Sequence, residues 1–249
     1  MDLKKEGRAF LAAIEFLTRI PVRAAWSEDA ARASLKYYPA VGAGLGLVAG
    51  LAFVAVSPVF GATVSAILAI ALTMVLTGAL HEDGLADTWD GMGASRDSAL
   101  DVMRDSRLGS FGALSLVVAL GLKSATLSSL VPAVAVLGLI AAHSASRGLI
   151  ILAMALHPYA RAEGAAASVS SAATRSNVAM ALALSAAALV GLGSTDMALP
   201  IIAVAGLALA LILHAFHARR LGGYTGDTLG ALQQYGEVAV LLAALALAT

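Results

Sequence analysis

Residues Tyr38 to Leu80 read YPAVGAGLGLVAGLAFVAVSPVFGATVSAILAIALTMVLTGAL, without a single charged side chain. A helix that crosses the hydrocarbon core of a bilayer needs about 20 mostly apolar residues. This stretch is long enough for two such helices, and Gly61 lies near its middle. We therefore predict spanning helices over Tyr38–Phe60 and Ala62–Leu80, with a minimal loop at Gly61.

Five further apolar stretches of suitable length follow along the chain. They are Phe111–Leu130, Val131–Leu156, Asn177–Gly193, Met197–Phe216 and Tyr235–Thr249. With no internal repeat and no soluble segment of domain size, the whole chain, residues 1–249, is expected to form one domain. The fold class predicted is all-α: a polytopic integral membrane protein with about seven transmembrane helices, embedded in the lipid bilayer.

The composition agrees with this class and excludes several others. The chain is 59% hydrophobic and only 13% charged, whereas soluble domains carry about 25% charged residues. Lys plus Arg and Asp plus Glu both number 16, and a chain of zero net charge is a poor nucleic-acid binder. With no cysteine, a disulfide framework, a thiolate zinc site and a thiol nucleophile are excluded.

The chain begins with a short apolar segment, Phe10–Ile20, that is interrupted by Glu15 and Arg19. Its apolar residues repeat at helical spacing, and no cleavage site follows, so it is not typical of a signal peptide. We predict an amphipathic helix on the membrane surface, ended by Pro21.

The basic residues predict the orientation of the helices, because cytoplasmic loops are enriched in Lys and Arg. Placing the N-terminus in the cytoplasm puts 14 of the 16 basic residues on that side. The exceptions are Arg147, inside a span, and Lys123, which this topology places near the outer face. The C-terminus is then outside, and the long polar loops His81–Ser110, His157–Ser176 and His217–Gln234 all face the cytoplasm.

The first of these loops opens with HEDGLADTWDG, His81 to Gly91. On a helix with 100° per residue, Asp83, Asp87 and Asp90 fall within about 60° of one another, with Glu82 beside them. Carboxylates gathered in this way repel unless a cation sits among them, and oxygen donors favour Mg²⁺ over Ca²⁺ or Mn²⁺. The alternative interpretation is a solvated acidic loop.

A second polar segment follows at once. Three arginines in it could hold phosphate oxygens opposite a metal: Arg96, Arg104 and Arg107. Asp105 lies between two of them, and Gly109 and Gly112 would let the backbone approach a ligand. Asp97 and Asp101 are as well explained by ion pairs within a helix.

The last cytoplasmic loop carries LGGYTGDTLG, Leu221 to Gly230. Its glycines suggest a turn near a bound group, with Asp227 as partner of a metal or hydroxyl. The alternative is that Asp227 or Thr228 caps the final helix.

Ionisable residues inside a span are functional candidates. His143 and Arg147 share a helix face, and Arg147 could reach the acidic cluster or a phosphate; the alternative is structural pairing between helices. His81 and His143 could ligate a metal, but no third histidine lies near them in the sequence, which argues against zinc. Glu237 would be costly near the membrane unless paired.

Together these motifs resemble those of the cobalamin synthase family, the adenosylcobinamide-GDP ribazoletransferases. The matching segments, in order, are Phe16–Val22, His81–Gly91, Met103–Gly112 and Gly222–Gly230. The resemblance implies an Mg²⁺-dependent enzyme of the bacterial inner membrane with a cytoplasmic active site. It would join adenosylcobinamide-GDP to α-ribazole or its 5′-phosphate and release GMP. A homo-oligomer is compatible with the sequence but not required by it.

The resemblance also suggests roles for individual residues. Glu82, Asp83, Asp87 and Asp90 would bind Mg²⁺, and the catalytic group would be Asp87, Asp90 and Asp105, with Asp105 completing the metal site or accepting the proton of the attacking hydroxyl. The residues expected to hold substrate or cofactor are His81, Arg104, Arg107, Arg147 and Asp227.

Two other functions share part of this pattern. A CDP-alcohol phosphotransferase of phospholipid synthesis carries Asp-x-x-Asp-Gly and a later acidic pair, which Asp87–Gly91 and Asp101–Asp105 imitate at a different spacing. A transporter would place carboxylates at mid-membrane, often in paired halves; here they are predicted at one face.

Overall fold

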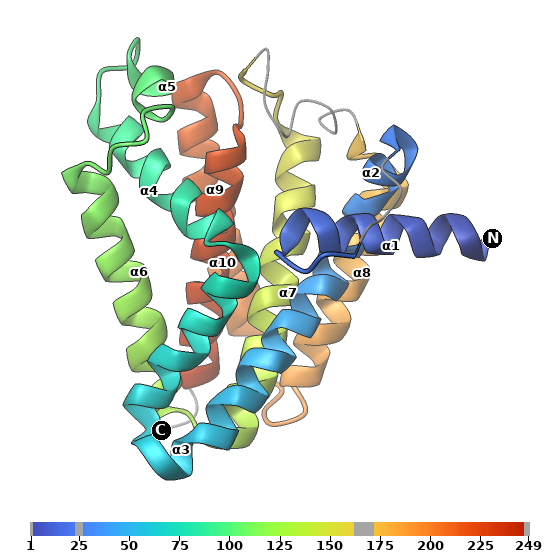
Figure 1. Ribbon diagram of the computed structural model, residues 1–249, viewed down its shortest axis with the longest axis vertical. Coiled ribbons are helices and arrows are strands. Elements are labelled where there is room, and N and C mark those ends of the chain that lie inside the picture. The colour runs from blue at the N-terminus through green and yellow to red at the C-terminus, as the bar shows by residue number, and fades with distance from the viewer. Residues whose placement is uncertain (1, 23–26, 162–171, 247–249) are drawn as a thin grey trace.

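The computed structural model describes residues 2–22, 27–161 and 172–246, and these form helices joined by short connections (Figure 1). The helices are α1 (Leu3–Leu17), α2 (Glu28–Ser34), a 3₁₀ turn η1 (Leu35–Tyr37), α3 (Tyr38–Thr77), α4 (Leu80–Gly93), α5 (Ala99–Val102), α6 (Ser110–Ser129), α7 (Pro132–Leu156), α8 (Arg175–Leu192), α9 (Leu199–Leu221) and α10 (Gly226–Ala246). The all-α class is confirmed.

Within the described residues, six helices are long and apolar enough to cross a membrane. The first of them, α3, is broken at Gly61, whose φ of 72° and ψ of 167° are not helical. The chain turns back at this break (Figure 1), so that Ala49 of the first leg and Ala69 of the second line the same small cavity. Counting the two legs separately gives the seven crossings that the sequence predicts.

Helix α7 is the centre of the bundle, since every residue from Ala141 to Ile151 is buried. It packs against α3, α8 and α10. Glycines make the contact with α3 possible, because a Cβ at Gly42 or Gly46 would collide with backbone carbonyls of α7. The small residues of the first apolar stretch therefore serve close helix packing.

The predicted surface helix is present as α1, which lies across the direction of the bundle helices (Figure 1). It is capped by Asp2 and starts at Leu3, seven residues before the predicted Phe10. It ends at Leu17 with Thr18 as its C-cap, so Pro21 is not what stops it. Beyond it, the Arg19 N–H donates to the Leu76 carbonyl at 2.7 Å. The side chain of Arg19 covers Gly78, where a Cβ would collide with it.

Three expectations from the sequence need correction. The second apolar leg ends at Thr77, because Gly78 and Ala79 adopt left-handed conformations that stop the helix. The polar segment His81–Ser110 is not a loop throughout, because its acidic motif lies in α4, which starts at Leu80 and packs on α10 and α6. The last helix starts at Gly226, nine residues earlier than predicted, and its expected end at Thr249 lies outside the described residues. Arg23, one of the basic residues assigned to the cytoplasmic side, also lies outside them.

Candidate active site

The acidic motif forms helix α4, as predicted, with Asp83, Asp87 and Asp90 along one side. The helix lies directly against the start of α10. A Cβ at Gly84 would lie 2.8 Å from the Asp227 carbonyl oxygen and 3.2 Å from the Cα of Gly230. The glycine of the motif thus allows two backbones to touch, which brings the carboxylates of α4 beside Asp227.

The glycine-rich loop before α10 is fastened to the segment that follows α7. Gly222 ends α9 in a left-handed conformation with a φ of 79°. The Tyr224 N–H then donates to the Pro158 carbonyl, and the Ala160 N–H to the Tyr224 carbonyl, each at 2.9 Å. These two bonds hold the two loops together next to α4.

The cap of α10 is neither of the two residues that the sequence suggested. The Thr225 hydroxyl accepts from the Thr228 N–H at 3.2 Å, and the Thr228 hydroxyl accepts from the Thr225 N–H at 2.9 Å. This reciprocal arrangement caps the helix at Thr225. Asp227 does not cap the helix: its Oδ2 accepts from the Thr225 hydroxyl at 3.4 Å and lies 2.8 Å from a guanidinium nitrogen of Arg161.

The carboxylates on α4 and α10 repel one another. Partial burial, together with the negative charges of Asp83, Asp227 and Asp90, raises the pKa of Asp87 to about 7, and Arg161 only partly offsets them. A group of this kind gains from a nearby cation. Arg161 was counted from the sequence only as a basic loop residue, and nothing in the sequence alone pairs it with Asp227.

Asp90 has a different environment from the rest of the acidic side. Its two carboxylate oxygens accept from the backbone N–H groups of Gly109 and Gly112, each at 2.8 Å, at the start of α6. A Cβ at either glycine would collide with this carboxylate. The two glycines were expected to admit a ligand; the group that they admit is Asp90, which caps α6.

Asp105 lies after the short helix α5, so it does not share a helix with Asp101. Its carboxylate binds the backbone N–H and the guanidinium of Arg107. This pairing holds the pKa of Asp105 below its ordinary value. The guanidinium of Arg107 and the side chain of Arg104 are exposed, where they can meet a soluble anion.

Beneath α4 the bundle contains a buried polar network, defined here by Glu82, Lys123, His143, Arg147, Gln233, Gln234 and Glu237. The Lys123 ammonium donates to Gln234 at 2.7 Å and to Glu237 at 3.0 Å. Gln234 in turn donates to Glu82 at 3.0 Å. The network ties the first turn of α4 to α6, α7 and α10.

Two basic residues of the network differ from expectation. Lys123 was expected near the outer face, but only 4% of its side chain is exposed, because it pairs with Glu237 inside the bundle. Arg147 is 1% exposed; it donates to the His143 carbonyl at 3.0 Å and lies 3.5 Å from Glu237. The structural alternative for Arg147, pairing between helices, is the one observed, and the expectation that Glu237 must be paired is confirmed.

The network also accounts for two other predicted residues. Glu82 belongs to it through one carboxylate oxygen, whereas the other, Oε2, is buried and has no hydrogen-bond partner within the described residues. His81 is buried at the start of α4, and its backbone lies against Gly230. Both residues face the interior rather than the exposed end of α4.

The donor set suits a hard cation only in part. Asp83, Asp87 and Asp227 supply oxygen atoms, and burial followed by the neighbouring negative charges raises the pKa of Asp87. Among the residues that the structure describes, however, no three His, Asp or Glu side chains converge as a formed metal site does. A cation would therefore have to draw these side chains together.

Comparisons with known proteins agree with the motif pattern. The family model described as cobalamin-5-phosphate synthase matches residues 9–245. Among curated relatives, an adenosylcobinamide-GDP ribazoletransferase of Leptothrix cholodnii is 44% identical over 97% of this chain and 96% of its own length. Those of Shewanella amazonensis and Escherichia coli are 40% and 36% identical, covering 98% and 96% of this chain and 97% and 100% of their own lengths. No solved structure matches.

Proposed function

Because this chain belongs to the cobalamin-5-phosphate synthase family, we propose that it is a membrane transferase that joins adenosylcobinamide-GDP to α-ribazole, or to its 5′-phosphate. The names of its relatives describe this transfer. In it, a ribazole hydroxyl attacks one phosphorus of the diphosphate. That phosphorus is the one on the cobinamide side: its bond to the bridging oxygen breaks, the guanosine-side phosphate leaves as part of GMP with the bridging oxygen, and the attacking hydroxyl gives up its proton.

The observation that carries the proposal is the meeting of α4 and α10 at Gly84. It brings Asp83 and Asp87 beside Asp227, and the fastened loops place Arg161 against the same carboxylate. A diphosphate is an anion, so it needs cationic groups around it. Arg161 would bind the phosphate oxygens, together with the exposed Arg104 and Arg107, which flank Asp105 in the sequence.

We propose that Asp83 and Asp87, with Asp227, hold Mg²⁺. Bound there, the metal would neutralise the diphosphate and the departing GMP. The support is the chemistry of the donors: they are three carboxylates, and burial together with the charges of its neighbours raises the pKa of Asp87. Glu82 and Asp90 were grouped with these ligands from the sequence; in the fold Glu82 joins the buried network and Asp90 caps α6.

Asp105 is the residue that we propose to bind and orient the hydroxyl of the ribazole acceptor. The Arg107 guanidinium lowers the pKa of Asp105 and so keeps the carboxylate ionised. An ionised carboxylate accepts a hydrogen bond and can orient a hydroxyl for attack. For this role the pair with Arg107 would have to open or to shift toward a phosphate.

We place the site on the cytoplasmic side of a bacterial inner membrane. Support comes from the basic residues, which concentrate in cytoplasmic loops. Arg219 and Arg220 end α9 at the end of the bundle where α4 ends, and Arg220 donates to the Ala94 carbonyl at 2.7 Å.

The test is an assay of the purified protein in lipid vesicles with Mg²⁺. We expect GMP to appear only when both adenosylcobinamide-GDP and α-ribazole are present, and chelation of the metal to stop it. CDP-diacylglycerol with an alcohol is the control substrate pair. Release of CMP, or GMP release that ignores the ribazole, would contradict the proposed function.

A further inference from the structure

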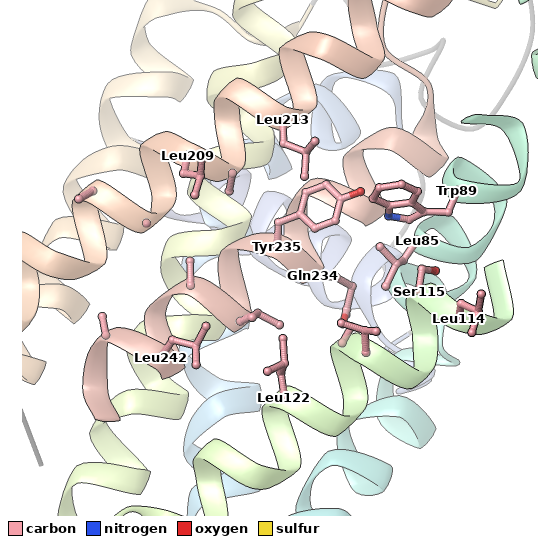
Figure 2. A pocket seen from close by; sticks show the side chains of 18 of the residues that line it. Leu85, Trp89, Leu114, Ser115, Leu122, Leu209, Leu213, Gln234, Tyr235 and Leu242 are labelled. Atoms are coloured by element: carbon pink, nitrogen blue, oxygen red, sulfur yellow. The ribbon is translucent and has the colours of Figure 1, made fainter. Parts of the chain in front are cut away.

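A cavity of about 950 Å³ lies between α4, α6, α9 and α10 (Figure 2). Its walls are almost wholly apolar, and no charged side chain is among the described residues that line it. The polar groups among the lining residues are few: Trp89, Ser115, Gln234 and Tyr235. We call this space the α6–α9 groove.

The groove runs along the helices rather than across them. On α6 it is lined from Phe111 to Leu122, on α9 from Ile202 to Leu213, and on α10 from Gln234 to Ala246, each at spacings of three and four residues. At 1.5 Å per residue, each stripe is about 17 Å long. The hydrocarbon core of a bilayer is about 30 Å thick, so the groove is as long as about one leaflet.

The groove and the acidic carboxylates lie on different sides of α4. At 100° per residue, the two α4 residues that line the groove point away from the direction midway between Asp83 and Asp87, Leu85 by about 180° and Trp89 by about 140°. A diphosphate in the groove would therefore be separated from Asp87 by the helix itself. It would also meet no cation from the part of the chain that the structure describes, because the lining residues there include no Lys, Arg or His.

The groove opens sideways, where α6 and α9 flank it without packing closely on each other. Its rim consists of exposed apolar side chains, among them Leu114, Val118 and Leu209. All of the rim lies within helices that are long and apolar enough to cross a membrane. In a bilayer, what surrounds this opening is lipid.

From the length, the uncharged walls and the lateral opening, we infer that the α6–α9 groove binds the acyl chains of a bilayer phospholipid. The acyl chains enter between α6 and α9 and contact the groove-lining side chains Leu85 and Trp89 of α4. They support α4 on the side opposite its carboxylates. Trp89 and Tyr235 lie side by side at one end of the groove (Figure 2), where amphipathic rings suit a junction between chain and headgroup.

Fluorescence of Trp89 tests the inference without reference to activity. The chain has two tryptophans, so Trp26→Phe leaves Trp89 as the reporter. This variant is placed in nanodiscs of phosphatidylcholine with brominated or ordinary acyl chains. We expect the brominated chains to quench Trp89 at least twofold, and aqueous iodide to have little effect.

A pair of substitutions on α9 separates the groove from the surrounding lipid. Ala205 lines the groove, whereas Ala208 is exposed on the same helix and does not. In the Trp26→Phe background, Ala205→Phe should reduce the quenching and Ala208→Phe should leave it unchanged. Ala119→Phe fills the groove from α6 and serves if Ala205→Phe does not fold.

Three outcomes would overturn the inference. The first is equal quenching in the variants that fill the groove and in Ala208→Phe. The second is quenching of Trp89 by iodide instead of by brominated chains, which would mean a water-filled groove. The third is no quenching by either, with dimers seen by mass photometry, which would mean that a second copy of the chain covers the opening.

Discussion

The Lys123 ammonium lies 3.0 Å from a carboxylate oxygen of Glu237 and 3.8 Å from one of Glu82, and at most 8% of any of these side chains is exposed. With Arg147, these residues form two negative and two positive charges. Charges inside a membrane bundle are tolerated when they are paired. The balance of the buried network, rather than any single bond in it, is what should determine stability.

Removing one member of this balance should destabilise the bundle strongly. We expect Lys123→Met to lower the free energy of unfolding by about 3–5 kcal/mol, because it removes the ion-pair partner of the buried Glu82 carboxylate. The double variant Lys123→Met with Glu82→Gln restores charge balance and should recover part of this loss. Thermal unfolding in one detergent measures both, and Lys4→Met is the control. If the double variant loses more stability than the two single variants lose together, charge balance does not determine the stability of the network.

Asp87→Asn should abolish transfer and leave insertion and folding intact, because the substitution keeps the shape and removes the charge. A loss of at least about 100-fold in turnover is expected for a group that stabilises charge at a reacting phosphate. Asp97→Asn, at an exposed position outside α4, is the matched control. Full activity of the Asp87 variant would refute its role in holding the metal.

Asp90→Ala should unfold more readily than the parent, since it leaves two N–H groups at the start of α6 without an acceptor. Hydrogen bonds to charged groups are worth about 1.5–3 kcal/mol each, so the loss of two should lower the free energy of unfolding by about 3–6 kcal/mol. Asp90→Asn keeps one acceptor oxygen, so its unfolding temperature should lie between those of the parent protein and Asp90→Ala. Unchanged stability with lost activity would instead assign Asp90 to the reaction.

Gly84→Ala should reduce activity by pushing α4 away from α10, where its Cβ would lie 2.8 Å from the Asp227 carbonyl. The same change at Gly121 of α6 meets nothing within 4 Å. Ala favours a helix over Gly by about 1 kcal/mol, so Gly121→Ala should be neutral or stabilising. Turnover and thermal unfolding of the two variants give the comparison. Equal behaviour would mean that the close approach at Gly84 is not needed.

The orientation can be measured directly because the chain has no cysteine. Ser106→Cys lies next to Asp105, and Ser194→Cys lies between α8 and α9 at the other end; both positions are exposed. A thiol reagent that does not cross membranes should label Ser194→Cys in intact spheroplasts and Ser106→Cys only after lysis. The reverse pattern would place the acidic helix outside the cytoplasm.

Most of the architecture could be predicted because apolar run length and glycine spacing are local features. Gly61 marks the turn between the two legs of α3, and the helical spacing of Asp83, Asp87 and Asp90 predicts α4. The start of α10 was missed, because its first turns carry the polar residues of the buried network. Polarity in those turns is typical of a loop unless the partners are known.

The partners themselves could not be predicted, because they come from distant parts of the chain. Nothing local to Lys123 indicates a bond to Glu237, which lies 114 residues away. Arg161 meets Asp227 only because the two loops are fastened through Tyr224. Likewise, the sequence shows Asp90 as one more carboxylate beside Asp87. It does not reveal that this carboxylate caps α6.

The position of Lys123 between two acids also bears on how the chain is made. When α6 first enters the bilayer during synthesis, Glu237 does not yet exist, and a lone ammonium in lipid is costly. Glu82 has already been made, and in the finished bundle it lies 3.8 Å from the same ammonium. Of its two carboxylate neighbours, Glu82 is therefore the one that can pair with Lys123 before α10 is made. Arriving last, α10 brings in Glu237 as the stronger partner, and Gln234 becomes the bridge to Glu82.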